Sequence, residues 1–287
     1  MDGFETHRQV IVGVDRSEAS RWAVRWAADE AAGRHLPLQL LHAQEWPTGR
    51  AEGAADRPWA IGLRAAGEAV LDTARLLAAE RQPGLEITSE LAEGRPVRVL
   101  REAADRAAQL VLGVRRLTEA RSALPIGSKG ASLAGHLGCP LALVPEPAAG
   151  VSGRGPVVVG VDGSPASRAA IGFAFEEASI GGTDVLAVEV RRPAEAGRPD
   201  LIEESLTDLS EALAGWPEKY PDIRVRREVL TGSPAPMLAT IATHTRCLVI
   251  GSRGLGGFRG LLFGSTGRAL VHRCTVPLVI VPNGNPA

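Results

Sequence analysis

The residues from 251 to 267, GSRGLGGFRGLLFGSTG, are the densest glycine cluster of the chain, with seven glycines among seventeen residues. They follow an apolar run at 247–250 that is typical of a buried strand, and they lead into a helical pattern. Glycine loses more conformational freedom on folding than any other residue. The cluster therefore indicates a sharp turn, close approach of a ligand to the backbone, or a simple flexible connection.

The spacing of these glycines excludes two common phosphate-binding motifs. GxxxxGK[ST] is absent, and Arg259 occupies the third glycine position of the dinucleotide fingerprint. Gly264, Ser265 and Thr266 nevertheless open a predicted helix, and the unpaired amides of a helix start bind phosphates readily. Arg253 could add positive charge. The pattern favours an anion site, and the alternative is a glycine loop in which Ser265 only caps the helix.

A second candidate is an aspartate that follows a buried strand at two places, in Gly13–Asp15 and in Gly160–Asp162. Ser17 and Ser164 come two residues later and are predicted helix caps. The aspartates could belong to the same caps, or they could meet a polar group of a ligand in the crevice at the strand ends.

These features recur because the chain contains an internal repeat. Residues 12–31 and 159–178 match at twelve of twenty positions without a gap, and later segments match in the same order. Among the later matches, Gly94-Arg-Pro96 corresponds to Gly232-Ser-Pro234. A period of this length indicates duplication of a whole domain, and the Pro- and Gly-rich residues 145–156 read as a linker.

Each repeat alternates short apolar runs with helical patterns, which predicts a doubly wound α/β sheet. Strands are expected near 9–14, 38–43, 85–91, 109–113 and 140–144, and again near 156–161, 184–190, 223–229, 247–251 and 277–281. Helices in the first repeat are expected near 17–33, 62–81, 96–107 and 128–137. The apolar last strands, 141–144 and 278–281, are expected to pair at their edges, because unpaired strand edges seek partners.

The bulk composition is that of an ordinary globular protein. The 287 residues are 45% hydrophobic and 23% charged, and the net charge of -1 argues against a nucleic-acid partner. No run approaches the roughly 18 apolar residues of a membrane span, and the polar start lacks a signal-peptide core, so we expect a cytoplasmic protein without a membrane partner. Cys139, Cys247 and Cys274 are expected to be buried small hydrophobes.

The combination of Gly251-x-x-Gly254, nine further residues and Gly264-Ser265 resembles the G-2x-G-9x-G-[S/T] signature of ATP-binding universal stress proteins. GVDGS at 160–164 adds to this resemblance, which covers essentially the whole duplicated chain and is of the tandem, actinobacterial-like type. It implies two tandem doubly wound α/β domains, each a five-stranded parallel sheet of order 3-2-1-4-5 flanked by helices. The expected domains are 1–147, with a degenerate nucleotide motif, and 154–287, with an intact one.

The resemblance also implies an ATP site in the second domain, with Mg²⁺ as a possible companion of ATP. Gly160 and Asp162 would lie beside ribose and adenine, and the backbone of Val190 would hold the adenine edge. The remaining residues of this implied site are Gly251, Ser252, Arg253, Gly254, Gly256, Gly257, Gly264, Ser265 and Thr266. The resemblance further implies domain pairing through the last strands, a homodimer, and a stress-responsive regulatory role toward an unknown protein partner.

The first repeat departs from the signature in its stretch GVRRLTEARSALPIGS, 113–128. Arg116 replaces the middle glycine, and the spacer that follows has ten residues instead of nine. A bulky side chain there could block the backbone approach, or its guanidinium could reach a phosphate. The expected degenerate site consists of Gly13, Asp15, Ala43, Gly113, Arg116, Gly127 and Ser128.

Two other classes of protein are possible. An enzyme would need further chemistry, and the chain contains no G-x-S-x-G elbow and only scattered histidines, so we expect no catalysis beyond weak ATP hydrolysis and no metal held by the protein alone. A structural interaction module of the same fold, with nucleotide binding lost or replaced by another small ligand, is the other alternative.

Overall fold

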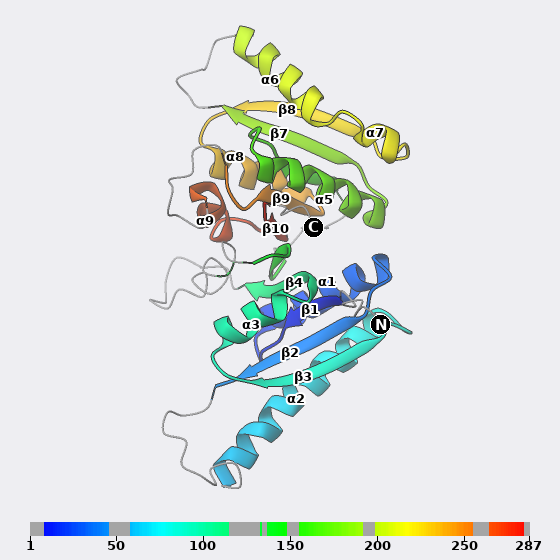
Figure 1. Cartoon of the computed structure of the whole chain (residues 1–287), viewed down its shortest axis with the longest axis vertical. Coiled ribbons are helices and arrows are strands. Elements are labelled where there is room, and N and C mark those ends of the chain that lie inside the picture. The colour runs from blue at the N-terminus through cyan, green and yellow to red at the C-terminus, as the bar shows by residue number, and fades with distance from the viewer. Residues whose placement is uncertain are drawn as a thin grey trace, which may run out of the picture. The chain divides into compact units, whose positions relative to one another are not determined.

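The computed structural model describes residues 9–45, 58–114, 133, 137–147, 155–191, 199–254 and 264–283. The chain divides into two compact units, residues 1–114 and 115–287, and each is described by itself (Figure 1). This division differs from the expected domain boundaries at 147 and 154, because the last strand of the first repeat is grouped with the second unit. The boundaries drawn from the sequence therefore stay a prediction.

The first unit alternates strands and helices as the sequence predicts. Its elements are β1 (Gln9–Gly13), α1 (Glu18–Gly33), β2 (Leu38–Gln44), α2 (Pro58–Arg81), β3 (Ile87–Glu93), α3 (Pro96–Ala104) and β4 (Ala107–Val114). The strands lie in the order β3-β2-β1-β4, and every pair within the unit is parallel. Val10, Ile11 and Val12 are fully buried, as expected for a central strand with both faces covered. The expected helix near 128–137 lies largely outside the described residues.

The second unit repeats this pattern and gains one strand from the first repeat. Its strands are β5 (Leu141–Pro145), β6 (Val157–Gly160), β7 (Val185–Arg191), β8 (Val225–Thr231), β9 (Cys247–Gly251) and β10 (Leu278–Val281). Its helices are α5 (Pro165–Gly181), α6 (Pro199–Ala212), α7 (Trp216–Lys219), α8 (Pro234–Ile241), the 3-10 helix η3 (Ala242–His244) and α9 (Ser265–Val271).

The sheet of the second unit has the order β5-β10-β9-β6-β7-β8. The two apolar last strands of the repeats, β5 and β10, lie side by side and antiparallel, with Leu278 opposite Leu143. The other described pairs are parallel. A two-unit α/β fold with a mostly parallel sheet is thus confirmed. The finer expectation of five strands in order 3-2-1-4-5 for each domain stays a prediction, since the first unit holds four of them.

The first helix of each repeat begins at the serine that the sequence identifies. Ser17 Oγ accepts a hydrogen bond from the Ser20 amide at 3.1 Å, and Ser164 Oγ accepts from the Ser167 amide at the same distance. These caps satisfy amides that have no partner inside the helix. Both helices then pack on the central strands of their sheet, α1 on β1 and β4, and α5 on β6 and β9. The cap therefore sets where each helix leaves the carboxyl edge of the sheet.

Candidate functional site

A cavity of about 340 Å³ lies at the carboxyl edge of the second unit's sheet. The ends of β6, β7 and β9 contribute to it, together with the first turns of α8 and α9. β6 has β7 on one side and β9 on the other, so consecutive connections diverge to opposite sides of β6 at this point. This reversal of strand order is where open α/β sheets form their ligand crevices.

Most of the residues predicted for the second domain line this cavity. They are Gly160, Asp162, Val190, Gly251, Arg253, Gly254, Gly264, Ser265 and Thr266. Gly256 and Gly257 lie outside the described residues. The structure thus brings together in space a strand-end aspartate and the glycines of the motif, which are about ninety residues away in the sequence.

Ser252 is the exception among the described residues of the prediction, because it does not line the cavity. It is buried, its amide donates to the Val281 carbonyl at 2.8 Å, and its carbonyl accepts from the Gly264 amide at 3.1 Å. These two backbone bonds join the end of β9 to β10 and to the start of α9. Ser252 is therefore a framework residue that holds the two ends of the glycine segment together.

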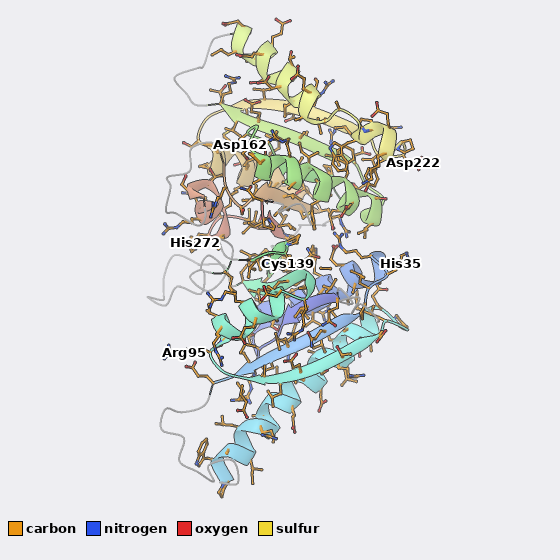
Figure 2. The ribbon with its side chains drawn as sticks, in the orientation of Figure 1. His35, Arg95, Cys139, Asp162, Asp222 and His272 are labelled. Carbon is orange, nitrogen blue, oxygen red and sulfur yellow. The ribbon has the colours of Figure 1, made fainter. Side chains whose placement is uncertain are left out.

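Asp162 serves the turn and lines the cavity at the same time. Its Oδ1 accepts a hydrogen bond from the Ser164 amide at 3.1 Å, which closes the turn into α5. The side chain is exposed and lies at the end of β6 (Figure 2). Its Oδ2 faces Gly254 so closely that a Cβ atom on that glycine would collide with it. The two readings of this aspartate, cap and ligand contact, are therefore compatible in one geometry.

Gly251 is required by packing within the protein. A Cβ atom there would come within 2.7 Å of the carbonyl carbon and the Cβ of Ala166, in the first turn of α5. Gly113 stands at the equivalent place in the first unit, where a Cβ atom would collide with the backbone of Ala19 in α1. Both glycines let the first helix lie against the end of the fourth strand. From the sequence, Gly251 is interpreted as a contact for ribose and phosphates. The packing against Ala166 gives the same glycine a structural role as well.

Ser164 connects α5 with the glycine segment, which the sequence did not reveal. It is 3% exposed, it caps α5, and its hydroxyl donates to the Arg253 carbonyl at 3.2 Å. Because Arg253 and Gly254 leave β9 at this point, the bond fixes the start of the glycine segment beside Asp162. A serine cap predicted from local sequence thus has a second, long-range partner.

The cavity also has an apolar wall that the sequence prediction missed. It is formed by Val161, Val188, Pro234, Leu238 and Ile250. Pro234 and Leu238 belong to α8, which begins after Gly232. The recurrence of Gly-Arg-Pro as Gly-Ser-Pro in the two repeats was the one signal that pointed to this helix. This recurrence predicts the start of a helix, but it does not predict that the helix lines a cavity.

In the first unit the structure places Gly13, Asp15, Ala43 and Gly113 at the carboxyl ends of β1, β2 and β4. Asp15 repeats the turn of Asp162, since its Oδ1 accepts from the Ser17 amide at 2.8 Å. A Cβ on Gly13 would meet the Leu112 side chain at 2.6 Å. Arg116, Gly127 and Ser128 lie outside the described residues, so the degenerate first site stays a prediction.

The three cysteines are all buried, as the sequence predicts. Burial raises the pKa of Cys274 to about 12, so its thiol stays protonated at neutral pH and is a poor nucleophile or metal ligand. Within the described parts of the chain, no group of three or more His, Cys, Asp or Glu side chains is arranged to hold a metal ion. Among the described helices, none combines the length and apolar character needed to cross a membrane.

The fold defines a pair of α/β repeats, and among the described residues of the second unit a cavity lies at the switch point of the sheet. The model of the universal stress protein family matches residues 6–145 and again residues 153–282. The chain belongs to the universal stress protein family, and it carries two copies of the family's domain.

Relatives that are matched over nearly their whole length support this assignment. The chain is 34% identical to the universal stress protein Rv2005c of Mycobacterium tuberculosis in an alignment of 295 positions, gaps included, that covers 94% of this chain and 96% of that protein. It is 33% identical to a universal stress protein of Mycolicibacterium smegmatis, with 96% and 97% covered. A crystal structure of a universal stress protein from Archaeoglobus fulgidus superposes with a TM-score of 0.71 at 15% identity, covering 98% of this chain and 99% of that one. The last likeness shows the fold alone.

Proposed function

We propose that this universal stress protein binds ATP in the 340 Å³ cavity of its second unit and acts as a nucleotide-dependent regulator in a stress response. The observation that carries the proposal is the convergence on one cavity of nine residues that the resemblance to universal stress proteins implies for an ATP site. The volume lies within the usual range of small-ligand pockets, about 300–1,000 Å³.

The cavity combines apolar and polar lining groups that suit the two ends of a nucleotide. The wall formed with Pro234, Leu238 and Ile250 is apolar and would accept a purine face, with the backbone of Val190 at its edge. The lining also has Asp162, the glycine backbone and the hydroxyls of Ser265 and Thr266, which would hold ribose and phosphates. Gly254 fits this assignment because any side chain there would occupy the space beside the Asp162 carboxylate.

The charges of the cavity suit a nucleotide that brings its own cation. Arg253 and Asp162 are the ionisable side chains among the described lining residues, so they nearly cancel. A triphosphate would then need Mg²⁺ to offset its charge, and Asp162 would be the carboxylate nearest to such an ion. Since one oxygen of Asp162 is engaged in the α5 turn, we expect it to position ligand rather than to activate water, and hydrolysis to be slow.

Mass spectrometry of small molecules released from the purified chain, followed by calorimetric titration with ATP and Mg²⁺, tests the proposal. We expect saturable binding of one adenine nucleotide. The substitution Asp162→Ala should weaken it at least tenfold, because it removes the polar group facing Gly254. The matched control is Asp15→Ala, which opens the equivalent turn in the first unit and should leave the affinity unchanged. If neither copurified nucleotide nor titrated ATP binds, the proposal fails.

A further inference from the structure

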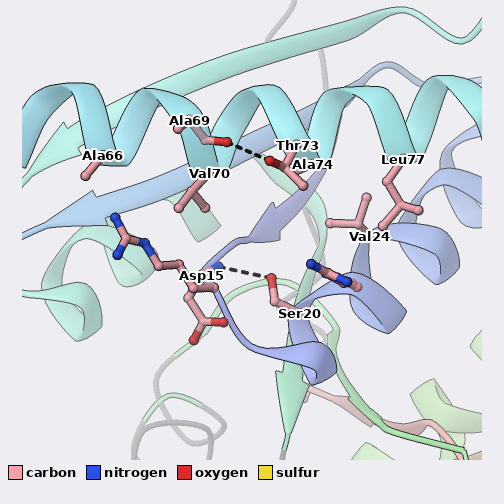
Figure 3. Close-up of a pocket in the computed structure, with 11 residues that line it drawn as sticks. Asp15, Ser20, Val24, Ala66, Ala69, Val70, Thr73, Ala74 and Leu77 are labelled. Atoms are coloured by element: carbon pink, nitrogen blue, oxygen red, sulfur yellow. Dashed lines mark hydrogen bonds between the residues drawn. The ribbon is translucent and has the colours of Figure 1, made fainter.

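The first unit has a cavity of about 270 Å³ between α1 and α2, beyond the carboxyl end of β1 (Figure 3). It is separate from the cavity proposed for ATP, which lies in the other unit. Asp15 and Ser20 lie at one end of this α1–α2 cavity, and the face of α2 from Ala66 to Leu77 lies along its other side (Figure 3).

The body of the cavity is apolar because α2 presents small side chains toward α1. Ala66, Ala69 and Ala74 stand where larger residues would fill the space, and Val24 and Val70 complete the wall. Val24, Val70 and Ala74 are buried, with exposures of 1%, 8% and 7%, whereas Ala69 is exposed, so the wall is an edge of the folded core that is open to solvent at Ala69. An apolar ligand group that lies against this wall is removed from water, which favours its binding.

The end of the cavity at Asp15 and Ser20 carries a surplus of positive charge. Arg16 and Arg21 line it against the single carboxylate of Asp15, whose Oδ1 already accepts the Ser17 amide. Arg21 lies 3.4 Å from Glu18 in a pair that is more than half exposed, and such pairs are weak. For Arg16, the structure shows no ion pair with a carboxylate of the described residues. The Ser20 oxygen accepts the Asp15 amide at 3.0 Å, which leaves its hydroxyl hydrogen able to donate.

The second unit provides an internal comparison, because it has a cavity in the equivalent place between α5 and α6. Arg168 stands there at the position of Arg21, but Gly163 replaces Arg16. The lining charges are four carboxylates, from Asp162, Glu189, Asp208 and Glu211, against the two guanidinium groups of Arg168 and Arg191. Each repeat therefore has a cavity beside its first helix, and the net charge of the lining residues is positive in the first repeat and negative in the second.

We propose that the α1–α2 cavity binds a small organic carboxylate with an aliphatic body, whose carboxylate lies between Arg16 and Arg21 and whose chain lies against the alanines of α2. A guanidinium group pairs with a carboxylate through two parallel hydrogen bonds. The volume admits a ligand on the order of ten non-hydrogen atoms and is below the usual range for larger ligands. The site would give the first repeat a ligand of its own.

Octanoate is a suitable probe of this size and charge, titrated calorimetrically into the full chain. We expect saturable binding of one octanoate, which neutral octanol and inorganic phosphate do not reproduce, since each lacks one half of the ligand. Arg16→Gly, which copies the second repeat, should weaken binding about tenfold. Arg168→Ala in the second unit is the matched control and should have no effect. Ala74→Leu should exclude octanoate by filling the cavity, while the melting temperature is kept.

Three results would overturn the assignment. Equal binding of octanol would show that the arginines contribute nothing, and unchanged affinity in Arg16→Gly would show that the carboxylate lies elsewhere. Displacement of octanoate by ATP would show that the cavity belongs to a nucleotide site. Because the expected octanoate site lies in the first unit and the proposed ATP site in the second, a failure of one leaves the other standing. Arg16→Gly changes an exposed residue, so it tests the site even if Ala74→Leu does not fold.

Discussion

At the scale of single residues, Gly251 and Gly254 belong to one motif, but different neighbours prevent a side chain at each position. Gly251 touches the backbone of Ala166 in α5, whereas Gly254 faces the exposed side chain of Asp162. Backbone in a packed helix cannot move aside, but a carboxylate at a cavity edge can. The motif spacing alone treats the two positions alike, and the structure separates a packing contact from a contact at the edge of the cavity.

This difference predicts opposite effects for the same substitution at the two glycines. Gly254→Val should abolish ATP binding and leave the melting temperature nearly unchanged, because only the Asp162 side chain is displaced. Gly251→Val should lower the unfolding free energy by about 2 kcal/mol or more, since overpacking distorts α5. Thermal unfolding and ATP titration of both variants check this. Normal ATP affinity in Gly254→Val would show that no group of the ligand needs the space beside that backbone.

Cys274 predicts a pH dependence of stability. Burial raises its pKa to about 12 in the folded state, above its ordinary value near 9, so the protonated thiol is the form that the fold favours. The stability that the protonated Cys274 thiol contributes to the fold is complete below pH 9. It is lost as the pH rises from 9 toward 12, by up to about 1.4 kcal/mol of unfolding free energy per pH unit. Comparing urea unfolding at pH 8 and pH 10.5 should show a smaller loss of stability in Cys274→Ala. An equal loss of unfolding free energy between pH 8 and pH 10.5 in the original chain and in Cys274→Ala would show that Cys274 is not the cause.

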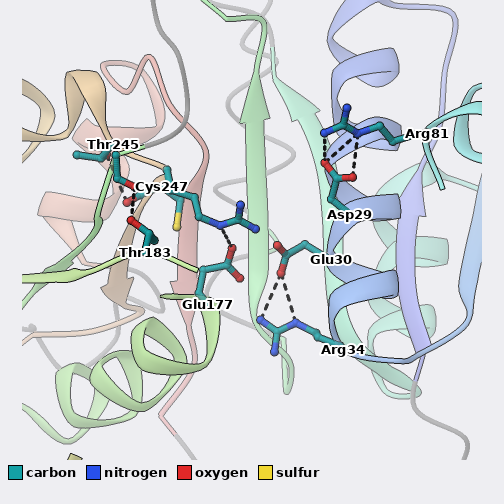
Figure 4. A network of polar contacts seen from close by, with 10 residues as sticks. Asp29, Glu30, Arg34, Arg81, Glu177, Thr183, Thr245 and Cys247 are labelled. Atoms are coloured by element: carbon teal, nitrogen blue, oxygen red, sulfur yellow. Dashed lines mark hydrogen bonds and ion pairs between the residues drawn. The ribbon is translucent and has the colours of Figure 1, made fainter. Parts of the chain in front are cut away.

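At the scale of elements, both repeats bury a glutamate on the first helix and pair it differently (Figure 4). Glu177 in α5 is fully buried and accepts from Arg246, just before β9, at 2.7 Å. Glu30 in α1 is also fully buried, and its partner Arg34 lies one turn further along the chain at 3.3 Å. The first pair ties a helix to a strand, while the second stays local.

The Glu177–Arg246 pair predicts a large effect of a single substitution. Arg246→Ala should lower the unfolding free energy by about 3 kcal/mol, because it removes a cation from a buried carboxylate. Arg81→Ala is the control: its guanidinium donates to Asp29 at 2.7 Å, but more than half of its side chain is exposed, so its loss should lower stability by less than about 1 kcal/mol. Chemical denaturation of both variants measures the contrast, and comparable losses would contradict it.

At the scale of the whole molecule, duplication has produced two units that share a fold and differ in their candidate sites. The second unit has a cavity at its switch point that the signature glycines line, and the first has its basic cavity between α1 and α2. Asp15 and Asp162 are equivalent in sequence and in their turns, yet they line cavities of different charge. The repeats thus serve as controls for each other.

The difference between the repeats predicts one tight ATP site for each chain. Arg116 stands where Gly254 stands in the second repeat, and the spacer after it is one residue longer. Equilibrium titration should therefore give a stoichiometry near one, and it should fall toward zero in Gly254→Val. Two sites of equal affinity would show that the first motif tolerates an arginine at its middle position.

The amino-acid sequence alone determined the duplication, the α/β class, the positions of nearly all described strands and the two serine caps. These follow from local periodicity and hydrogen bonding, which neighbouring residues set among themselves. It also pointed to most of the residues lining the second unit's cavity, because the glycine spacing and the strand-end aspartate are local patterns. The pairing of the two apolar last strands followed from their hydrophobicity, and the antiparallel register did not.

Only the tertiary structure decided which distant residues meet. It brought Pro234 and Leu238 to the apolar wall, joined Ser164 to the carbonyl of Arg253, and fixed Gly251 against α5. It also left a hollow beside Arg16 where the alanines of α2 face α1. The size of a cavity depends on the combined volumes of side chains from elements far apart in the chain, and a local sequence pattern does not contain this information.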